Sequence, residues 1–545
     1  MSARPSVPRA APRGEPTLHE RLDAVAAEHP DQLIRFHSER TELTYAELVA
    51  SSKRAAARLD AGPGEAVGIL APNGPEFLQT VFAASRIGAA ACPLPLPAGL
   101  RDLVEYGERT ARIVAAAEMR SLVLSTRLRR MLGQRAEAFG AKEILDSTEL
   151  VAPGRETAPV AVDPELPAIL QFTSGSTSAP KGVLLTHDNV LACAESITEA
   201  IALGPADAHA SWLPLFHDMG LFGTLTGIFT GIPVNLWNPT AFVKDPGRWL
   251  AEFAQTRATI TTMPNFAFDA LLDADPAGLD LSAWRVCFNG AEIIRPESVR
   301  AFASRFAGAG FRAEAMTPGY GMAEATLVAT LPPLGRTPVV EAVDRHELAR
   351  GRAVKGDKEI VGLGRAVPGM EIRIAGGSPD GSVGEVELRG AAVTSGYLDD
   401  PVRPADDGIF TADGWLRTGD LGYLRAGELF FAGRAKEMIT VRGVNTYPSD
   451  VEAEVSQVSG VRRGRCVAYA VLEPHEHVAV VAETALPEAE HDALRRAIAA
   501  RVRRALGLAT GSSLTVHLTA PDSLPRTTSG KLRRLATAAL LERSA

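Results

Sequence analysis

The residues most suited to chemistry lie in one short segment, from Gln171 to Val183. It holds hydroxyl side chains, glycines and one lysine: Thr173, Ser174, Gly175, Ser176, Thr177, Lys181 and Gly182. Glycine lets the backbone approach a bulky ligand, hydroxyls and amides donate hydrogen bonds, and lysine adds positive charge. The segment therefore predicts a loop that holds a polyphosphate, although loops of this composition are more often plain surface turns. Pro180 precedes the lysine where the Walker pattern requires glycine.

Three later segments combine glycine turns with polar side chains: Phe288–Glu292, Pro318–Thr326 and Gly414–Gly422. Tyr320 lies between glycines and can offer a flat face to a nucleobase. Glu324 supplies the hard oxygen ligand that magnesium prefers. Asp420 sits in a glycine-flanked turn and could accept hydrogen bonds from both hydroxyls of a ribose. Taken singly, the same residues also fit a strand-to-helix turn, a buried tyrosine and a turn-forming aspartate.

Two further segments complete the set, the first from Arg434 through Glu452 and the second, which is basic, from Leu524 to Arg534. Runs of charge usually form solvated faces. Lys531, however, follows Thr-Ser-Gly near the end of the chain. On a mobile domain it could be moved into a cleft as a single positive charge.

The elements that must position these residues alternate between short apolar runs and amphipathic stretches. Strands are predicted at Ala66–Leu70, Ser121–Ser125, Ile232–Leu236, Ala258–Thr262 and Trp284–Phe288. A helix is predicted from Glu76 to Ile87, another begins at a cap near Thr186 and ends near Ala200, and Thr44 with Glu47 has the spacing of a capping box. Alternation of this kind indicates a parallel sheet covered by helices, with ligands at the carboxyl ends of the strands.

We therefore predict an α/β fold with a large N-terminal domain of mostly parallel sheets plus a β-rich subdomain, and a small mobile α+β C-terminal domain. Short strands near Ile372–Ile374 and Glu385–Leu388 indicate the β-rich subdomain. The predicted boundaries are a disordered lead-in at 1–15, the N-terminal domain at 16–432, a hinge at 433–436 and the C-terminal domain at 437–545.

Composition limits the class of function. The chain has 545 residues and a net charge of −8, which argues against general binding to nucleic acid or anionic membranes. Its four cysteines are far apart, so we expect buried thiols without disulfides in the cytoplasm. The longest uncharged stretch, Met219–Val243, contains prolines and glycines and is not expected to span a membrane.

Six segments in this order resemble the adenylate-forming superfamily, over the chain from about Pro16 to its end. The resemblance implies ATP and Mg²⁺ as cofactors, with adenine on Tyr320, the metal on Glu324 and ribose on Asp420 and Arg434. It also implies that Lys531 drives adenylation and that Lys436 marks the hinge. The full set of implied ATP-binding residues is Thr173, Ser174, Gly175, Ser176, Thr177, Lys181, Asn289, Gly290, Ala291, Glu292, Tyr320, Gly321, Met322, Asp420 and Arg434.

Within that superfamily the chain is most similar to fatty acyl-AMP ligases. The similarity rests on Leu213–Leu221 with its His-Asp-Met-Gly, on Ala323 before the glutamate, and on extra polar sequence between Leu331 and Ile360 where those ligases carry an insertion. Gly443–Pro448 departs from their usual pattern. His217 is expected near the substrate carboxylate or the mouth of the acyl tunnel, or else is a satisfied core residue.

The resemblance implies activation of a fatty or other carboxylic acid to acyl-AMP with release of pyrophosphate, followed by transfer to an acyl carrier protein. An acyl-CoA or aryl-CoA ligase is the alternative enzyme. A catalytically silent nucleotide-binding homologue is the alternative from another class. The intact set Lys181, Glu324, Asp420, Arg434 and Lys531 disfavours it.

Overall fold

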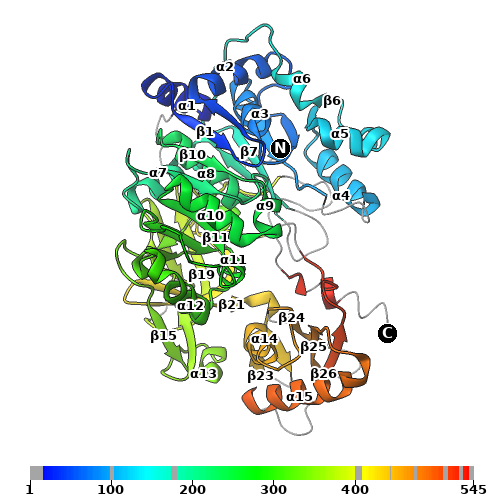
Figure 1. Ribbon diagram of the computed structural model, residues 1–545, viewed down its shortest axis with the longest axis vertical. Helices are drawn as coiled ribbons and strands as arrows, with labels where there is room; N and C mark the ends of the chain where they lie inside the picture. Colours follow the sequence, from blue (N-terminus) through cyan, green and yellow to red (C-terminus); the bar gives the residue numbers. More distant parts are fainter. Residues whose placement is uncertain are drawn as a thin grey trace.

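The computed structural model describes residues 16–97, 103–173, 181–377, 379–398, 408–441, 444–462, 464–471, 476–506, 514–526, 532–534 and 536–538. Figure 1 shows a large upper part that contains the N-terminal elements, and a smaller part at the lower end formed by α14, α15 and β23 to β26.

The first large sheet has six strands in the spatial order β6-β5-β3-β4-β7-β8. Their bounds are β3 (Ala66–Leu70), β4 (Ala90–Pro93), β5 (Ser121–Leu124), β6 (Glu143–Asp146), β7 (Pro167–Thr173) and β8 (Lys181–Thr186). Neighbours are parallel except β7 and β8, which are antiparallel. Every residue of β3, β4 and β5 is buried, as in a sheet covered on both faces.

The second large sheet has seven strands in the order β13-β12-β11-β9-β10-β1-β2. Their bounds are β1 (Leu33–Phe36), β2 (Thr41–Thr44), β9 (His209–Ser211), β10 (Val234–Leu236), β11 (Ile260–Pro264), β12 (Val286–Gly290) and β13 (Met316–Pro318). Only the β1–β2 pair at one edge is antiparallel. The carboxyl ends of β11, β12 and β13 therefore meet at one edge of the sheet.

Helices pack on these sheets and join them into one core. Those of the first half are α1 (Leu18–Glu28), α2 (Tyr45–Ala56), α3 (Pro75–Arg86), α4 (Leu103–Ala116), α5 (Thr126–Leu132), α6 (Ser147–Val151) and α7 (His187–Ala200). Those that follow are α8 (Asp218–Phe229), α9 (Pro239–Lys244), α10 (Pro246–Thr256), α11 (Asn265–Leu271) and α12 (Pro296–Phe306). Capping boxes satisfy the free amides at the start of α1, α2 and α7, and the predicted box of Thr44 and Glu47 is confirmed.

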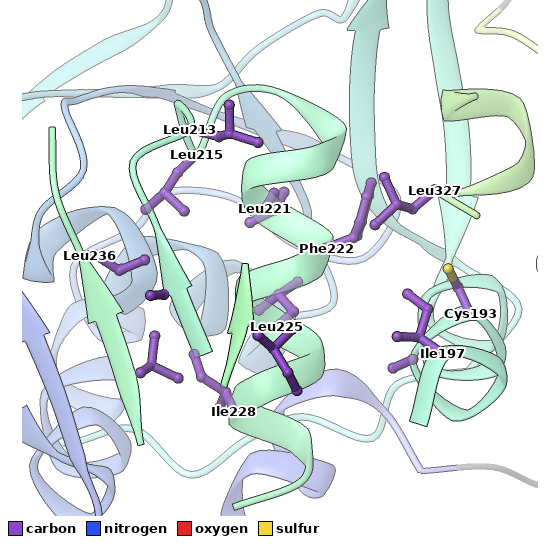
Figure 2. Close-up of a cluster of buried hydrophobic side chains, with 14 of the residues drawn as sticks. Cys193, Ile197, Leu213, Leu215, Leu221, Phe222, Leu225, Ile228, Leu236 and Leu327 are labelled. Atoms are coloured by element: carbon purple, nitrogen blue, oxygen red, sulfur yellow. The ribbon is translucent and has the colours of Figure 1, made fainter. Parts of the chain in front are cut away.

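Helix α8 lies at the centre of this core. Figure 2 shows Phe222 extending toward Leu327 on one side of the helix, where Ile197 of α7 also lies, and Leu215 and Leu236 on the other side. A helix that is apolar on all faces belongs inside the protein. No helix in the described part of the chain is both long and apolar enough to cross a membrane.

An antiparallel four-stranded sheet follows, formed by β18 (Met370–Ile374), β19 (Gly384–Gly390), β20 (Leu416–Arg425) and β21 (Glu428–Arg434). Between β14 (Thr330–Leu331) and β17 (Arg365–Ala366), which pair with each other, lie β15 (Val340–Val343), α13 (Arg345–Ala349) and β16 (Lys358–Val361). Strands β15 and β16 form an antiparallel pair. We call the segment 340–361 the insertion.

The C-terminal part has its own small core. A single turn of 3₁₀ helix at Ala435–Glu437 leads into β22 (Ile439–Val441), β23 (Val444–Thr446) and α14 (Pro448–Ser456). A three-stranded sheet of β24 (Cys466–Val471), β25 (His477–Glu483) and β26 (Leu514–Thr519) packs against α14 and α15 (Glu488–Leu506).

The predicted α/β fold class is confirmed, including the parallel sheets and the β-rich subdomain. One local interpretation is wrong. The sequence was expected to run from a strand through the phosphate loop directly into a helix, but β8 lies between the loop and α7. It pairs with β7, so that Thr173 and Lys181 stand opposite each other across a hairpin. The apolar run Val183–Leu185 is too short to separate a strand from the start of a helix by periodicity.

The four cysteines are all buried and unbridged, as predicted. Cys92, Cys193 and Cys287 lie in β4, α7 and β12 of the large part, and Cys466 lies in β24 of the small part.

Candidate active site

A cavity of about 1720 Å³ opens where β11, β12 and β13 end. Its far wall comes from β20, β21 and α14, so that the large sheet, the β-rich sheet and the C-terminal part all border it. The predicted nucleotide-binding residues within the described ranges all line it: Thr173, Lys181, Asn289, Gly290, Ala291, Glu292, Tyr320, Gly321, Met322, Asp420 and Arg434. His217, Glu324 and Lys436 line it as well. Ser174, Gly175, Ser176, Thr177 and Lys531 lie outside the described residues.

Tyr320, Asp420 and Arg434 form a connected group in the cavity wall. The Tyr320 hydroxyl donates a hydrogen bond of 2.9 Å to Oδ2 of Asp420, and Nε of Arg434 lies 3.2 Å from Oδ1. The pairing of β20 with β21 places Asp420 directly opposite Arg434. Burial raises the pKa of Asp420, while the positive charge of Arg434 acts in the opposite direction. The group offers an aromatic face beside a buried carboxylate.

The turns at this edge leave almost no room for side chains. A Cβ on Gly321 would lie 1.7 Å from the carbonyl oxygen of Leu327, so only glycine fits the turn after Tyr320. Ala291 has φ +66°, a left-handed conformation that is uncommon for alanine. Backbone groups therefore face the cavity directly at both turns.

Asn289 is fully buried at the end of β12. Its Nδ2 lies 3.4 Å from Oδ1 of Asn265, but its own Oδ1 has no hydrogen-bond partner among the described residues. A buried acceptor without a partner is costly and calls for a donor. An exocyclic amine of a base in the cavity is such a donor. Glu292, three residues on, instead accepts a hydrogen bond from the backbone of Phe266.

Lys181 and Glu324 lie near a shared tyrosine. The Tyr397 hydroxyl donates a 2.6 Å hydrogen bond to Oε1 of Glu324, and Nζ of Lys181 lies 4.6 Å from the centre of the Tyr397 ring. No cluster of three or more His, Cys, Asp or Glu side chains suited to a metal occurs in the described ranges. A single carboxylate fits Mg²⁺, which is held mostly by phosphate oxygens and water when it accompanies a nucleotide.

His217 caps the N-terminus of α8 at the cavity wall, and its ring lies 4.9 Å from that of Phe216. Gln171, at the other side of this corner, donates a 3.0 Å hydrogen bond to the carbonyl oxygen of Phe216. His217 thus lines the cavity, and its place near the substrate carboxylate stays a prediction.

The C-terminal part contributes to the cavity through the turn that carries Lys436 and through Arg534. Arg534 binds both oxygens of Glu452 at 2.7 Å and Glu437 at 2.5 Å, so it ties the end of the chain to that turn. Burial lowers the pKa of Lys436, and the charge of Arg434 lowers it further. Leu532, which follows Lys531 in sequence, lines the cavity.

The insertion contacts α14 through two ion pairs. Nζ of Lys358 lies 2.6 Å from Oδ1 of Asp450, and Nη1 of Arg345 lies 3.3 Å from Oε1 of Glu454. Lys358 also lies 4.9 Å from the centre of the Tyr447 ring. All four paired side chains are largely buried, since none exposes more than 19% of its surface. The insertion is thus attached to the C-terminal part.

Motif reasoning missed the apolar end of the cavity. It is lined by Ile197, Ile201, Leu203, Ile232 and Ile260, which come from three stretches: the end of α7 with the turn after it, the segment before β10, and β11. Thr262 and Phe266 also line it. Trp237 does not: its ring stacks on His37 with centroids 4.1 Å apart.

A protein-family model described as AMP-binding enzyme matches residues 22–398. Together with the parallel sheets and the cavity at their carboxyl ends, the match defines an adenylate-forming ligase. The chain belongs to the AMP-binding enzyme family.

Several individual proteins and structures are similar to this chain over most of its length. A structure from a study of fatty acyl-adenylate ligases of E. coli and L. pneumophila is 30% identical, with a TM-score of 0.89 over 97% of this chain and 98% of that one. A 4-hydroxyphenylalkanoate adenylyltransferase of Mycobacterium tuberculosis is 34% identical, covering 87% of this chain and 82% of the relative. A protein of the same species named as fatty-acid–CoA ligase fadD25 is 32% identical, covering 90% of each.

Proposed function

We propose that this enzyme activates a fatty or aryl-substituted alkanoic acid with ATP and passes the acyl group to the phosphopantetheine thiol of an acyl carrier protein. The observation that carries the proposal is a single cavity with two different ends. Tyr320, Asp420 and Arg434 border one end, and aliphatic side chains border the other. Such a cavity suits a nucleotide joined to an apolar acyl group.

In the first step a carboxylate oxygen attacks the α-phosphorus of ATP. The bond from that phosphorus to the oxygen bridging to the β-phosphorus breaks, and pyrophosphate leaves with the electron pair. Such a reaction needs positioning and neutralisation of charge more than covalent help from the protein. Asp420 and Arg434 would hold the ribose, Asn289 Oδ1 would accept from the adenine amine, and Tyr320 would pack on the base.

Charge at the phosphates would be met by Lys181, by the loop residues Ser174 to Thr177, and by Lys531. Glu324 would hold Mg²⁺, which supplies charge neutralisation at the phosphate oxygens. His217, at the corner between the two ends of the cavity, would face the carboxylate of the acid.

In the second step a thiol sulfur attacks the acyl carbon, the bond to the AMP oxygen breaks and the thiol proton is lost. The two ion pairs between the insertion and α14 favour a carrier protein over free CoA as the donor of that thiol. Breaking the Lys358–Asp450 and Arg345–Glu454 pairs would be required if α14 turned away to open a CoA site. Removing one partner of a largely buried pair is costly, so these contacts would oppose such a rotation.

The test of the first step is acid-dependent release of pyrophosphate, with mass spectrometry of the adenylate formed from a panel of acids. The expected result is an acyl adenylate in the absence of any thiol. Pyrophosphate release that is the same with and without acid would overturn the proposal.

The test of the second step is a comparison of acceptors. The enzyme, ATP and one acid are incubated with CoA or with holo carrier protein, and the products are weighed. We expect acylated carrier protein and little acyl-CoA. Efficient acyl-CoA formation would favour the second candidate, an acyl-CoA ligase, to which the name of the Mycobacterium tuberculosis relative points.

A further inference from the structure

The apolar end of the cavity, which we call the channel, is bordered by α8 and by the strands β9 and β11. Beside the aliphatic side chains its wall contains Thr226, Thr262 and His209, the first residue of β9. The ring lies against a face of α8 that has no side chains. A Cβ on Gly223 would be 3.5 Å from Cε1 of His209, and one on Gly227 would be 3.3 Å from its Cβ. Two glycines one helical turn apart thus make room for the imidazole.

The Nε2 atom of His209 has no hydrogen-bond partner among the residues the structure describes, although only 4% of the residue is exposed. Burial lowers the pKa of this imidazole to about 4, so the ring is neutral at neutral pH. A buried polar atom without a partner costs free energy, and proteins normally supply one. Because His209 lines the cavity, a bound acyl group can supply that partner.

A second polar atom borders the same space. The position that a Cβ would occupy on Gly223 is 3.9 Å from Nε2 of His209 and 4.0 Å from Oγ1 of Thr262. Gly223, His209 and Thr262 all line the cavity. The two side chains come from adjacent parallel strands, in which Ala210 stands opposite Thr261. The channel therefore contains a small polar spot within an apolar wall.

We propose that this spot is a specificity site for an acyl group that carries a hydroxyl at a distance from its carboxyl, bound by Nε2 of His209 beside Thr262. The inference rests on the proposed adenylation of a carboxylic acid. A hydroxyl suits the spot because it can donate and accept, and so can pair with either tautomer of a neutral imidazole. A charged substituent does not suit it, since burying an unpaired charge costs far more.

The position of His209 along α8 places it away from the reacting carboxylate. Gly223 and Gly227 follow His217 by six and ten residues, which is about 9 Å and about 15 Å along a helix. His209 therefore contacts the channel well below the corner where the carboxylate would react. It is a specificity-determining residue and does not touch the reacting atoms.

The experiment compares matched acids on wild type and variants, with acid-dependent pyrophosphate release as the readout. One pair is decanoic acid and its monohydroxy isomers, which place the hydroxyl at successive depths. The other pair is phenylpropanoic acid and its para-hydroxy derivative, which separates a phenolic from an aliphatic hydroxyl. For the best-placed hydroxyl, wild type is expected to show a kcat/KM about 10- to 100-fold above that for the unsubstituted acid.

His209→Leu is expected to remove that preference by lowering kcat/KM for the hydroxylated acid and raising it for the plain one. His209→Gln keeps a donor and an acceptor and is expected to retain part of the preference. Ile260→Leu is the matched control in the same wall, and it should alter both acids alike. Thermal melting of each variant shows whether it folds. If His209→Leu does not fold, the test rests on His209→Gln.

Three outcomes are distinguishable. If no acid stimulates pyrophosphate release, the proposed function fails. If acids are activated but neither His209 variant changes the ratio between hydroxylated and plain acids, the inference is overturned and Nε2 is satisfied by a water molecule only. If the ratio collapses in His209→Leu, survives in part in His209→Gln and is unchanged in Ile260→Leu, the specificity site is established.

Discussion

The two ends of the cavity are each proposed to bind one part of the same acyl adenylate, but their linings differ. At the nucleotide end the polar groups are connected, and Tyr320, Asp420 and Arg434 form one chain of contacts. At the acyl end aliphatic side chains surround one imidazole whose Nε2 has no partner in the described part of the chain. In the proposed function the first arrangement holds the nucleotide. In the proposed specificity site the second leaves the choice of acid to one side chain.

The largest effect is expected from removing the charge of Lys531, which is proposed to meet the phosphates. Lys531→Ala should slow acyl-adenylate formation about 10²- to 10³-fold, because a cation aimed at developing charge typically contributes that much. ATP binding, measured by calorimetry, should stay within about threefold. The loss should be equal for hydroxylated and plain acids. Adenylation within tenfold of wild type would show that Lys531 lacks this role.

A smaller effect is expected at Asp420, which is proposed to hold the ribose and not the reacting atoms. Asp420→Asn should raise the KM for ATP about 10- to 100-fold, since hydrogen bonds to a charged acceptor are the stronger kind. The ratio between acids should not change. The control is Asp413→Asn, an exposed carboxylate in the turn before β20 that pairs with Arg373 of the same sheet. Equal losses in the two variants would assign the effect to the stability of the sheet.

Substitutions in the insertion should change which thiol acceptor is used, without changing substrate binding at either end of the cavity. Lys358→Ala together with Arg345→Ala is expected to raise acyl-CoA formation about 3- to 10-fold, because two restraints on α14 are lost together. Adenylate formation should be unaffected. Arg300→Ala removes an exposed ion pair between α12 and Glu359 of the same insertion and serves as the control. Unchanged use of CoA in the double variant would contradict a restraining role.

The smallest effect is expected at His187, a buried histidine with a structural role, in contrast to the role proposed for His209. His187 is buried with its Nδ1 accepting a hydrogen bond from the backbone of Leu18, and burial lowers its pKa to about 3. The unfolded chain binds a proton near pH 6.5 and the folded chain does not, so stability is complete above that pH and falls as pH drops toward 3. The slope is at most about 1.4 kcal/mol per pH unit for each such histidine.

His187→Gln should flatten that slope in urea unfolding measured between pH 7.5 and pH 4.5, without changing the preference among acids. His209→Leu should also flatten it but change the preference. A steep slope that survives both substitutions would assign the acid sensitivity to other groups.

The nucleotide end could be predicted from sequence because its geometry is local. Gly321 must be glycine, and Tyr320 and Glu324 lie within four residues of it. The acyl end could not be predicted, because the role proposed for His209 depends on its position beside Gly223 and Thr262, which belong to other elements. The β7–β8 hairpin was missed for a different reason. Its second strand merges with the cap of α7, and only pairing with β7 distinguishes it.

The buried cysteines have a practical consequence. Burial raises the pKa of the Cys193 thiol to about 11 and that of Cys466 to about 12, so both stay protonated and shielded in the native state. A thiol-modifying reagent can therefore label the chain only where it has opened. Because Cys466 lies in the small part and the other three cysteines lie in the large part, thiol labelling reports the opening of each part separately. Mass spectrometry of the labelled peptides would show which part opens first and whether bound nucleotide slows one more than the other.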